Sequence, residues 1–172
     1  MVVELSTIRS SIIASYDSHV NTQNLQRADQ GTWHTFLEAT RLLFEELDRR
    51  LHGDAGISLA DYGLLFRLSG ADEWGLRMSE LAEGTMSSRS RISHAVDRLE
   101  GMGWVERRAC PTDRRGSYAS LTEAGRRKLE EAEPCHSEVV GRHLLDHVTP
   151  SGGFEEVMAA VRDSFQTGTS RG

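Results

Sequence analysis

Residues 76–129 read LRMSELAEGTMSSRSRISHAVDRLEGMGWVERRACPTDRRGSYASLTEAGRRKL, and this stretch decides the fold. It opens with a short extended piece and then MSELAEG, which predicts a very short helix that ends at Gly84. Ser88 is a suitable N-cap for a second helix, because apolar residues recur after it at helical spacing. These apolar residues are Ile92, Ala95, Val96, Leu99 and Met102. Gly103 suits the left-handed position that ends a helix, so the second helix is expected to stop there.

Two strands are expected directly after this helix. The segments WVERRA (104–109) and SYASLT (117–122) have strand character, and CPTDRRG (110–116) holds the Pro, Asp and Gly typical of a hairpin tip. A short helix, a tight turn, a basic helix, a strand, an arginine-rich hairpin and a strand follow one another in the order of a winged helix-turn-helix. The predicted fold class is therefore mainly α with a small β-wing (α+β).

Longer helices are expected on the N-terminal side. Apolar residues from Trp33 to Leu51 recur at alternating steps of four and three, which is typical of a helix that packs along another helix. The segment HGDAG (52–56) is expected to end this helix, and Ser58 to cap the next one. The predicted apolar face of that next helix consists of Leu59, Tyr62, Leu65, Phe66 and Leu68.

The C-terminal part is expected to hold two more helices. Thr122 caps the first, which is predicted to be kinked or interrupted at Pro134 and to resume as far as Val148. The second carries apolar residues from Phe154 to Phe165. These outer apolar stripes have no evident partner inside a winged domain, so they predict a dimer interface. The predicted organisation is an N-terminal extension (1–31), dimerisation helices (32–56 and 122–166) and a winged helix-turn-helix DNA-binding domain (57–121).

The charge distribution indicates a polyanionic partner. The whole chain carries a net charge of −6, but residues 87–116 hold seven arginines against four acidic residues. An α-helix fits the major groove of DNA, and an arginine-tipped hairpin suits the backbone or the narrow minor groove. The predicted DNA-binding residues are Ser87, Ser88, Arg89, Ser90, Arg91, His94 and Arg98 of the basic helix and Asp113, Arg114 and Arg115 of the hairpin.

The same residues resemble the core of the MarR family of winged helix-turn-helix regulators. The matching features are Leu81-Ala82 in the short helix, VDRLE at 96–100, the D-R-R wing at 113–115 and L-T-x-x-G at 121–125. The resemblance covers about residues 32–165 in element order. It implies an obligate homodimer that places two recognition helices and two wings on one palindromic site in double-stranded DNA. Such regulators usually repress transcription until a ligand releases them.

The resemblance also implies a place for a small-molecule effector. Some members of the family sense small phenolic or aromatic carboxylates between the dimer helices and the winged domain. The corresponding ligand-binding candidates here are the aromatic Trp33, Phe36, Tyr62 and Phe66, with Arg41 or His136 as polar anchors. Aromatic residues at helical spacing are also typical of a core, so both interpretations stay open.

Metal- and redox-responsive regulators of the same fold are alternatives. His143 and His147 stand four residues apart, a spacing that suits zinc, but such a pair arises by chance in a chain with seven histidines. Cys110 follows two arginines, which favour a reactive thiolate. Peroxide sensors of the family carry their cysteine near the first helix, however, and this chain has none before Cys110. We therefore predict no metal, no cofactor and an inert thiol.

Other function classes find less support. Motifs such as GxSxG and GxxxxGK do not occur, so no enzyme is expected. A winged helix that serves only protein interaction is a further alternative, although such a module is expected to lose the arginines of its recognition face. No apolar run reaches about 18 residues, and the first residues do not form a secretory signal. The expected location is the cytoplasm, with no membrane partner.

Overall fold

The computed structural model describes residues 27–71, 75–85, 87–109, 116–148, 153–159 and 161. The chain divides into two compact units, residues 1–41 and residues 42–172, and the boundary lies within helix α2 (Arg27–Ala55). In the first unit the described part of α2 carries a stacked aromatic pair, Trp33 and Phe36, with ring centroids 5.8 Å apart. None of the helices in the described part of the chain is both long and apolar enough to cross a membrane.

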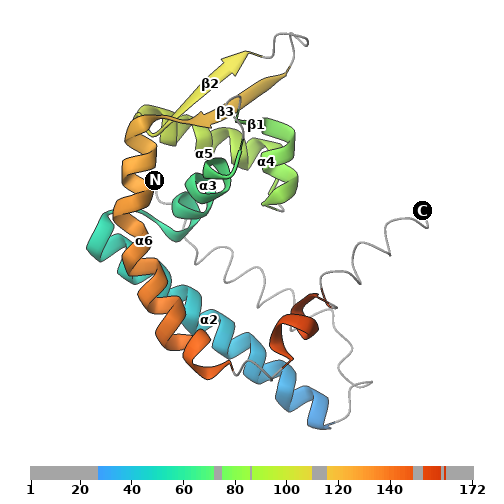
Figure 1. The fold of residues 1–172 in the computed structure, drawn as a ribbon. Coiled ribbons are helices and arrows are strands. Elements are labelled where there is room, and N and C mark those ends of the chain that lie inside the picture. The colour runs from blue at the N-terminus through green and yellow to red at the C-terminus, as the bar shows by residue number, and fades with distance from the viewer. Residues whose placement is uncertain are drawn as a thin grey trace, which may run out of the picture. The chain divides into compact units, whose positions relative to one another are not determined.

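The second unit is mainly helical with one small sheet, which confirms the predicted fold class (Figure 1). After α2 its elements are α3 (Leu59–Ser69), β1 (Leu76–Arg77), α4 (Met78–Gly84), α5 (Arg89–Gly101), β2 (Val105–Ala109), β3 (Ser117–Leu121), α6 (Glu123–His143) and the 3-10 helix η2 (Leu145–His147). The antiparallel sheet has the strand order β1-β3-β2, so β3 lies between the wing strand β2 and the short β1. Residues 154–159 and 161 are helical, and Phe165 lies outside the described residues.

Local hydrogen bonds explain where three helices begin. The side-chain oxygens of Ser58, Ser88 and Thr122 accept the backbone N–H groups three residues further on, at 3.0, 3.3 and 3.0 Å. Each oxygen thereby satisfies an N–H that would have no partner inside its helix. Thr122 also donates its hydroxyl to the carbonyl oxygen of Gly103 at 2.6 Å, which ties the start of α6 to the turn after α5. All three predicted caps are confirmed.

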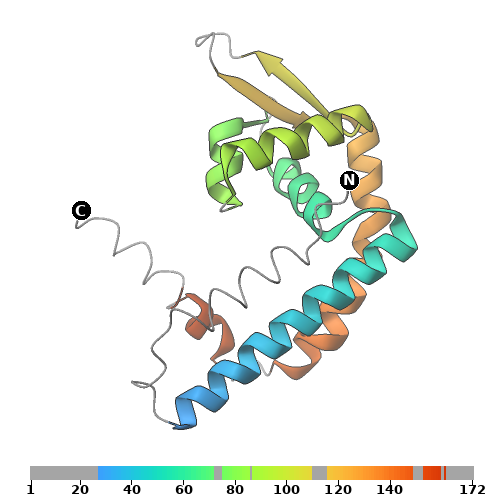
Figure 2. The same ribbon diagram turned by 180° about the vertical axis from the view of Figure 1, so that it is seen from behind.

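A single apolar core holds the second unit together. Buried side chains of α3, α4, α5 and the sheet form most of this core. The C-terminal half of α2 and helix α6 add further buried residues to it, and these two helices run side by side in both views (Figures 1 and 2). Its completely buried residues include Leu51, Leu65, Val96 and Leu99. The predicted face of α3 was partly wrong. Phe66 is 62% exposed, and Leu64 is buried in its place.

Two glycines lie so close to the backbone of a neighbouring segment that a side chain would not fit. Gly75 has φ +83°, and a Cβ atom there would lie 2.1 Å from the carbonyl oxygen of Ala119. At Gly125 a Cβ atom would lie 2.0 Å from the carbonyl oxygen of Trp104. The L-T-x-x-G pattern therefore has a physical reason: the threonine caps α6, and the glycine lets the first turn of α6 rest on the strand entry at Trp104.

Some helix limits differ from the sequence-based expectation. Helix α2 begins at Arg27 rather than at residue 32 and runs through most of HGDAG to Ala55, before Gly56 turns the chain at φ +61°. Helix α6 runs through Pro134, so of the two predicted alternatives, a kink or an interruption, the interruption was wrong. Pro134 is exposed, and the hydrogen bond that it cannot donate is lost on the solvent side of the helix. Helix α6 also ends at His143 instead of continuing to Val148.

Candidate nucleic-acid interface

Helix α5 presents a polar face opposite its buried one. Ile92, Val96 and Leu99 face the core. The residues predicted to read DNA lie on the outer surface at the start of the helix. Of these, Ser88, Arg89, Ser90, Arg91 and His94 are exposed, and Ser87 is half-buried. Among the described residues no carboxylate forms an ion pair with Arg89 or Arg91, so both guanidinium groups face solvent without a counter-charge.

Arg98, the remaining candidate of the helix, is engaged within the protein. Its guanidinium group donates to the carboxylate of Asp61 on α3, which also accepts the hydroxyl of Ser58 at 2.8 Å. The Asp61 side chain is only 10% exposed, whereas that of Arg98 is 50% exposed. The ion pair therefore joins α5 to α3 at the edge of the core, and part of Arg98 remains in contact with solvent.

Arg107 on β2 has a similar internal role. Its guanidinium group donates to the carbonyl oxygen of Ser93 at 2.9 Å and pairs with the carboxylate of Asp97 at 2.7 Å. The side chain is 28% exposed, and the carboxylate of Glu100 lies 3.9 Å from its Nε. Arg107 thus ties the wing strand to α5, and its charge is matched by acidic residues of the same helix. Arg108 on the same strand is likewise paired, with Glu106.

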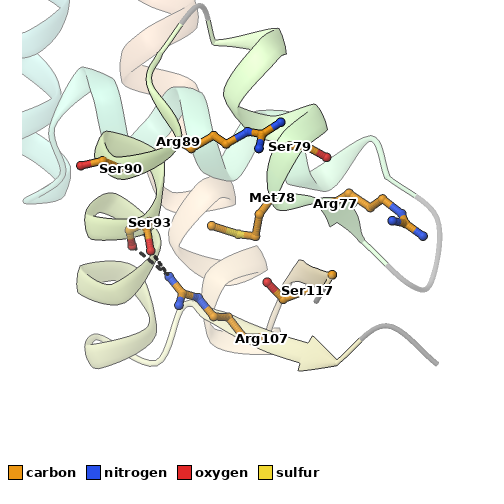
Figure 3. Close-up of a pocket in the computed structure, with 9 residues that line it drawn as sticks. Arg77, Met78, Ser79, Arg89, Ser90, Ser93, Arg107 and Ser117 are labelled. Atoms are coloured by element: carbon orange, nitrogen blue, oxygen red, sulfur yellow. Dashed lines mark hydrogen bonds between the residues drawn. The ribbon is translucent and has the colours of Figure 1, made fainter. Parts of the chain in front are cut away.

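A surface hollow of about 530 Å³ opens between α5, the start of α4 and the base of the wing (Figure 3). Its lining contains three arginines and four serines and no acidic residue. The lining residues are Arg77, Met78, Ser79, Arg89, Ser90, Ser93, Arg107, Gly116 and Ser117. Arg77 donates its Nε–H to the hydroxyl of Tyr118 at 3.0 Å, and its guanidinium carbon lies 5.3 Å from the centre of the Tyr118 ring.

The sequence-based candidates did not include Arg77, Ser79 or Ser117. Arg77 and Tyr118 are cross-strand neighbours in the pairing of β1 with β3, so the sheet register brings the two segments together. A signal for this existed in the sequence, because the extended piece before α4 was expected, but its partner strand was not assigned. The hairpin candidates Asp113, Arg114 and Arg115, and also Cys110, lie outside the described residues.

Part of the predicted ligand site forms an aromatic cluster between α3 and α6. The ring of Tyr62 stacks on His136 with centroids 4.5 Å apart and on Phe66 with centroids 6.3 Å apart. Burial lowers the pKa of His136 below its ordinary value and raises that of Tyr62, so both rings are favoured in the neutral form. The other candidates, Trp33, Phe36 and Arg41, belong to the first unit.

The structure describes the histidine pair of the metal alternative and the second cysteine of the chain, Cys135, whereas Cys110 of the redox alternative lies outside the described residues. In the part of the chain that the structure describes, which includes His143 and His147, no group of three His, Cys, Asp or Glu residues could hold a metal ion. Cys135 is buried beside Asp54, and burial is the main reason why the pKa of its thiol is raised. A raised pKa disfavours the thiolate, which is the reactive form of cysteine.

Solved structures of other proteins match the chain over most of its length. One is Sco3205, a MarR family transcriptional regulator from Streptomyces coelicolor that was crystallised in complex with DNA. It is 41% identical in sequence, with a TM-score of 0.77, and the match covers 81% of this chain and 89% of Sco3205. The chain belongs to the MarR family. The resemblance that the sequence motifs indicated is thereby confirmed.

Further comparisons agree with MarR membership. AbsC, another MarR family regulator of Streptomyces coelicolor, is 35% identical with a TM-score of 0.78, and the match covers 86% of this MarR protein and 98% of AbsC. A family model described as the MarR family matches residues 55–116. The transcriptional repressor MprA of Escherichia coli K12 is 35% identical over 79 residues, which are 46% of this chain and 45% of MprA. The chain thus spans less than half the length of this curated relative.

Proposed function

We propose that this MarR protein is a homodimeric transcriptional repressor that binds a palindromic operator in double-stranded DNA and is released by a small aromatic or phenolic ligand. The observation that carries the proposal is the exposed cationic start of α5, where Arg89 and Arg91 have no carboxylate partner among the described residues. The complex of Sco3205 with DNA and the name of MprA as a repressor support the same function.

The chemistry of this face suits base reading. In the proposed complex, α5 lies in the major groove, where an arginine can donate two hydrogen bonds to guanine. Ser90 and His94 are exposed one turn apart and reach base edges beside it. The free N–H groups at the start of α5, near Ser87 and Ser88, suit a phosphate. The wing residues Asp113, Arg114 and Arg115 are proposed to enter the minor groove.

Exposed apolar side chains support the homodimer. Phe44 is 52% exposed, Leu145 is 58% exposed and Val157 is 55% exposed, which is costly for side chains that face water. They lie on α2, on η2 and in the helical segment after residue 153, the parts of the chain predicted to dimerise. A second copy of the chain would cover them, since oligomers of this kind bury the same patch on both subunits.

The effector is proposed to bind at the cluster of Tyr62, Phe66 and His136. Phe66 is 62% exposed, so one face of the cluster is open to a planar aromatic ring. A neutral imidazole and a neutral phenol can exchange hydrogen bonds with a phenolic hydroxyl or a carboxylate. The ligand-binding roles of Trp33, Phe36 and Arg41 stay predictions. A ligand that binds one spacing of the two recognition helices more tightly would shift the dimer away from the DNA-bound spacing.

The test is a gel shift of the purified dimer on the DNA upstream of its own gene, with a salt series and non-specific competitor. We expect a discrete complex that weakens steeply as salt rises. Arg91→Gln should weaken this complex, whereas Arg127→Gln, which removes an exposed arginine of α6, should not. A folded dimer that shifts no upstream fragment would refute the DNA-binding function and favour a protein-interaction module. Release by zinc or peroxide, with none by phenolic carboxylates, would favour the metal- or redox-responsive alternative.

A further inference from the structure

Lys128, near the start of α6, reaches the end of α2. Its ammonium group donates to the carbonyl oxygen of Ala55, the last residue of α2, at 2.9 Å. The last carbonyl groups of a helix have no partner inside it, and a cation is favoured at this end of the helix dipole. The Lys128 side chain is only 18% exposed, and Glu131 pairs with it at 2.8 Å. Lys128 therefore ties α6 to the C-terminal end of α2.

The same ammonium group lies over Trp104, which connects the recognition helix to the wing. Lys128 Nζ is 5.5 Å from the centre of the Trp104 ring, within the range of a cation–π contact. Trp104 stands between α5 and β2 in the chain. Its backbone N–H donates to the carbonyl oxygen of Leu99 at 3.0 Å, and its own carbonyl oxygen accepts the N–H of Thr122 at 3.1 Å. Trp104 is thus bonded both to the end of α5 and to the start of α6.

One side chain therefore joins three helices. Figure 1 shows α6 running from the end of α5 along α2, so the three meet near the start of α6. The ion pair of Asp61 with Arg98 holds α5 to α3, whereas Lys128 acts on the C-terminal end of α5 through Trp104. In the proposed dimer, α2 carries part of the interface and α5 reads the operator. The attachment of α5 to α2 and α6 then sets where each recognition helix lies.

We propose that Lys128 is a positioning residue for operator recognition, which sets the spacing of half-sites that the dimer accepts. It acts through Ala55 and Trp104 and makes no contact with DNA itself. The proposal rests on the proposed function and deepens it, because it names a residue that determines which arrangement of two half-sites is bound.

The first experiment compares operators of different spacing. It uses the upstream fragment that the gel shift identifies, and the same fragment with one base pair inserted between the half-sites. The insertion turns one half-site by about one tenth of a turn relative to the other, so the parent dimer should bind it far more weakly. In Lys128→Met this discrimination should fall by about tenfold, roughly the factor that a hydrogen bond to a charged group contributes to an equilibrium.

A ratio of two affinities separates positioning from stability. A variant that is merely less stable loses active dimer equally for both operators, so its discrimination stays that of the parent. Lys128→Arg keeps the charge and the hydrogen-bond donors and should retain the discrimination. Arg127→Met should retain it too, because it removes a charge from the adjacent, exposed position of α6. Circular dichroism melts of each variant show whether the fold is retained.

The second experiment observes the contact with the ring. With Trp33 and Trp74 replaced by phenylalanine, Trp104 is the only tryptophan of the chain. In this background Lys128→Met should change the fluorescence emission of Trp104. Arg127→Met should leave it unchanged, since Lys128 lies over the ring whereas Arg127 pairs with Glu123.

Three results would count against the proposal and leave DNA binding intact. These are an unchanged Trp104 emission in Lys128→Met, a spacing discrimination equal to that of the parent, and a fall of about 1.8 in the slope of log K against log [salt], which would make Lys128 a phosphate contact. If the parent binds no upstream fragment at all, the proposed function itself fails.

Discussion

Replacing Asp61 by asparagine removes the carboxylate that holds Arg98 between α3 and α5. Removing one partner of a fully buried ion pair costs about 3–5 kcal/mol, whereas exposed pairs contribute about 0.2–1 kcal/mol. Here the Asp61 side chain is 10% exposed and the Arg98 side chain 50% exposed, so the pair lies between these limits. Asparagine also keeps an oxygen that can accept the Ser58 hydroxyl. We expect a loss of about 1–2 kcal/mol in the free energy of unfolding.

A double-mutant cycle measures this pair directly. Asp61→Asn, Arg98→Gln and the double variant are unfolded at one protein concentration, because the stability of a dimer depends on concentration. Each single variant should melt about 2–8 °C lower, at about 2–4 °C per kcal/mol for a chain of this size. The double variant should lose little more than either single one. Losses that add within about 0.5 kcal/mol would refute the bracing role of the pair.

The same variants distinguish an Arg98 that holds α5 in place from an Arg98 that contacts DNA. If Arg98 only positions α5, Arg98→Gln weakens DNA binding without changing the slope of log K against log [salt], and Asp61→Asn has a similar effect. The sequence predicted that Arg98 binds DNA. If it contacts a phosphate, the slope of log K against log [salt] should fall by about 1.8 for the Arg98→Gln dimer, at about 0.9 per phosphate, and stay unchanged for Asp61→Asn. We expect the first result, because Asp61 already accepts a hydrogen bond from this guanidinium group.

Further predictions concern stability and reactivity. Gly125→Ala should destabilise the fold by about 1–3 kcal/mol, since the new Cβ atom meets the Trp104 carbonyl oxygen, whereas Gly101→Ala, with open space around it, should be neutral or slightly stabilising in chemical denaturation. Because burial lowers the pKa of His136 below its ordinary 6.5, the unfolded state binds the proton more readily. The free energy of unfolding should therefore fall as the pH drops through 6.5, and a His136→Gln variant whose pH profile matched the parent would contradict this. Cys135, buried and with a raised thiol pKa, should react with iodoacetamide only after unfolding, as measured by peptide mass; rapid labelling of the folded protein would contradict its burial.

The helix starts could be predicted from the sequence because their determinants are local. Ser58, Ser88 and Thr122 each bond to a backbone group three residues away, so a few neighbouring residues contain the whole signal. The course of α6 through Pro134 could not be predicted in this way. Whether a proline ends a helix depends on whether packing on the other turns outweighs the lost bond, and the buried Ala132 and Val139 anchor α6 on both sides of it.

The bonding partners of the arginines could not be predicted from the sequence, because each bond joins segments that are far apart in the chain. Arg98 and Asp61 are 37 positions apart, and Arg77 and Tyr118 are 41 positions apart. Charge counting treats each arginine as a free surface charge. The sheet register and the packing of α3 against α5 decide which arginines are bonded inside the protein, and no periodicity along the chain carries that information.

This difference changes what the basic segment can do. Of its seven arginines, Arg98, Arg107 and Arg108 are paired with carboxylates in the described structure. The paired arginines Arg98 and Arg107 tie α5 to α3 and to the wing strand, so we expect their contribution to DNA binding to be geometric rather than electrostatic. Non-specific attraction grows with the number of available charges, whereas specific recognition needs a rigid face. A chain with net charge −6 and few uncompensated arginines on this face should therefore bind random DNA weakly, and its discrimination between operator and random DNA should depend on the ion pairs behind that face.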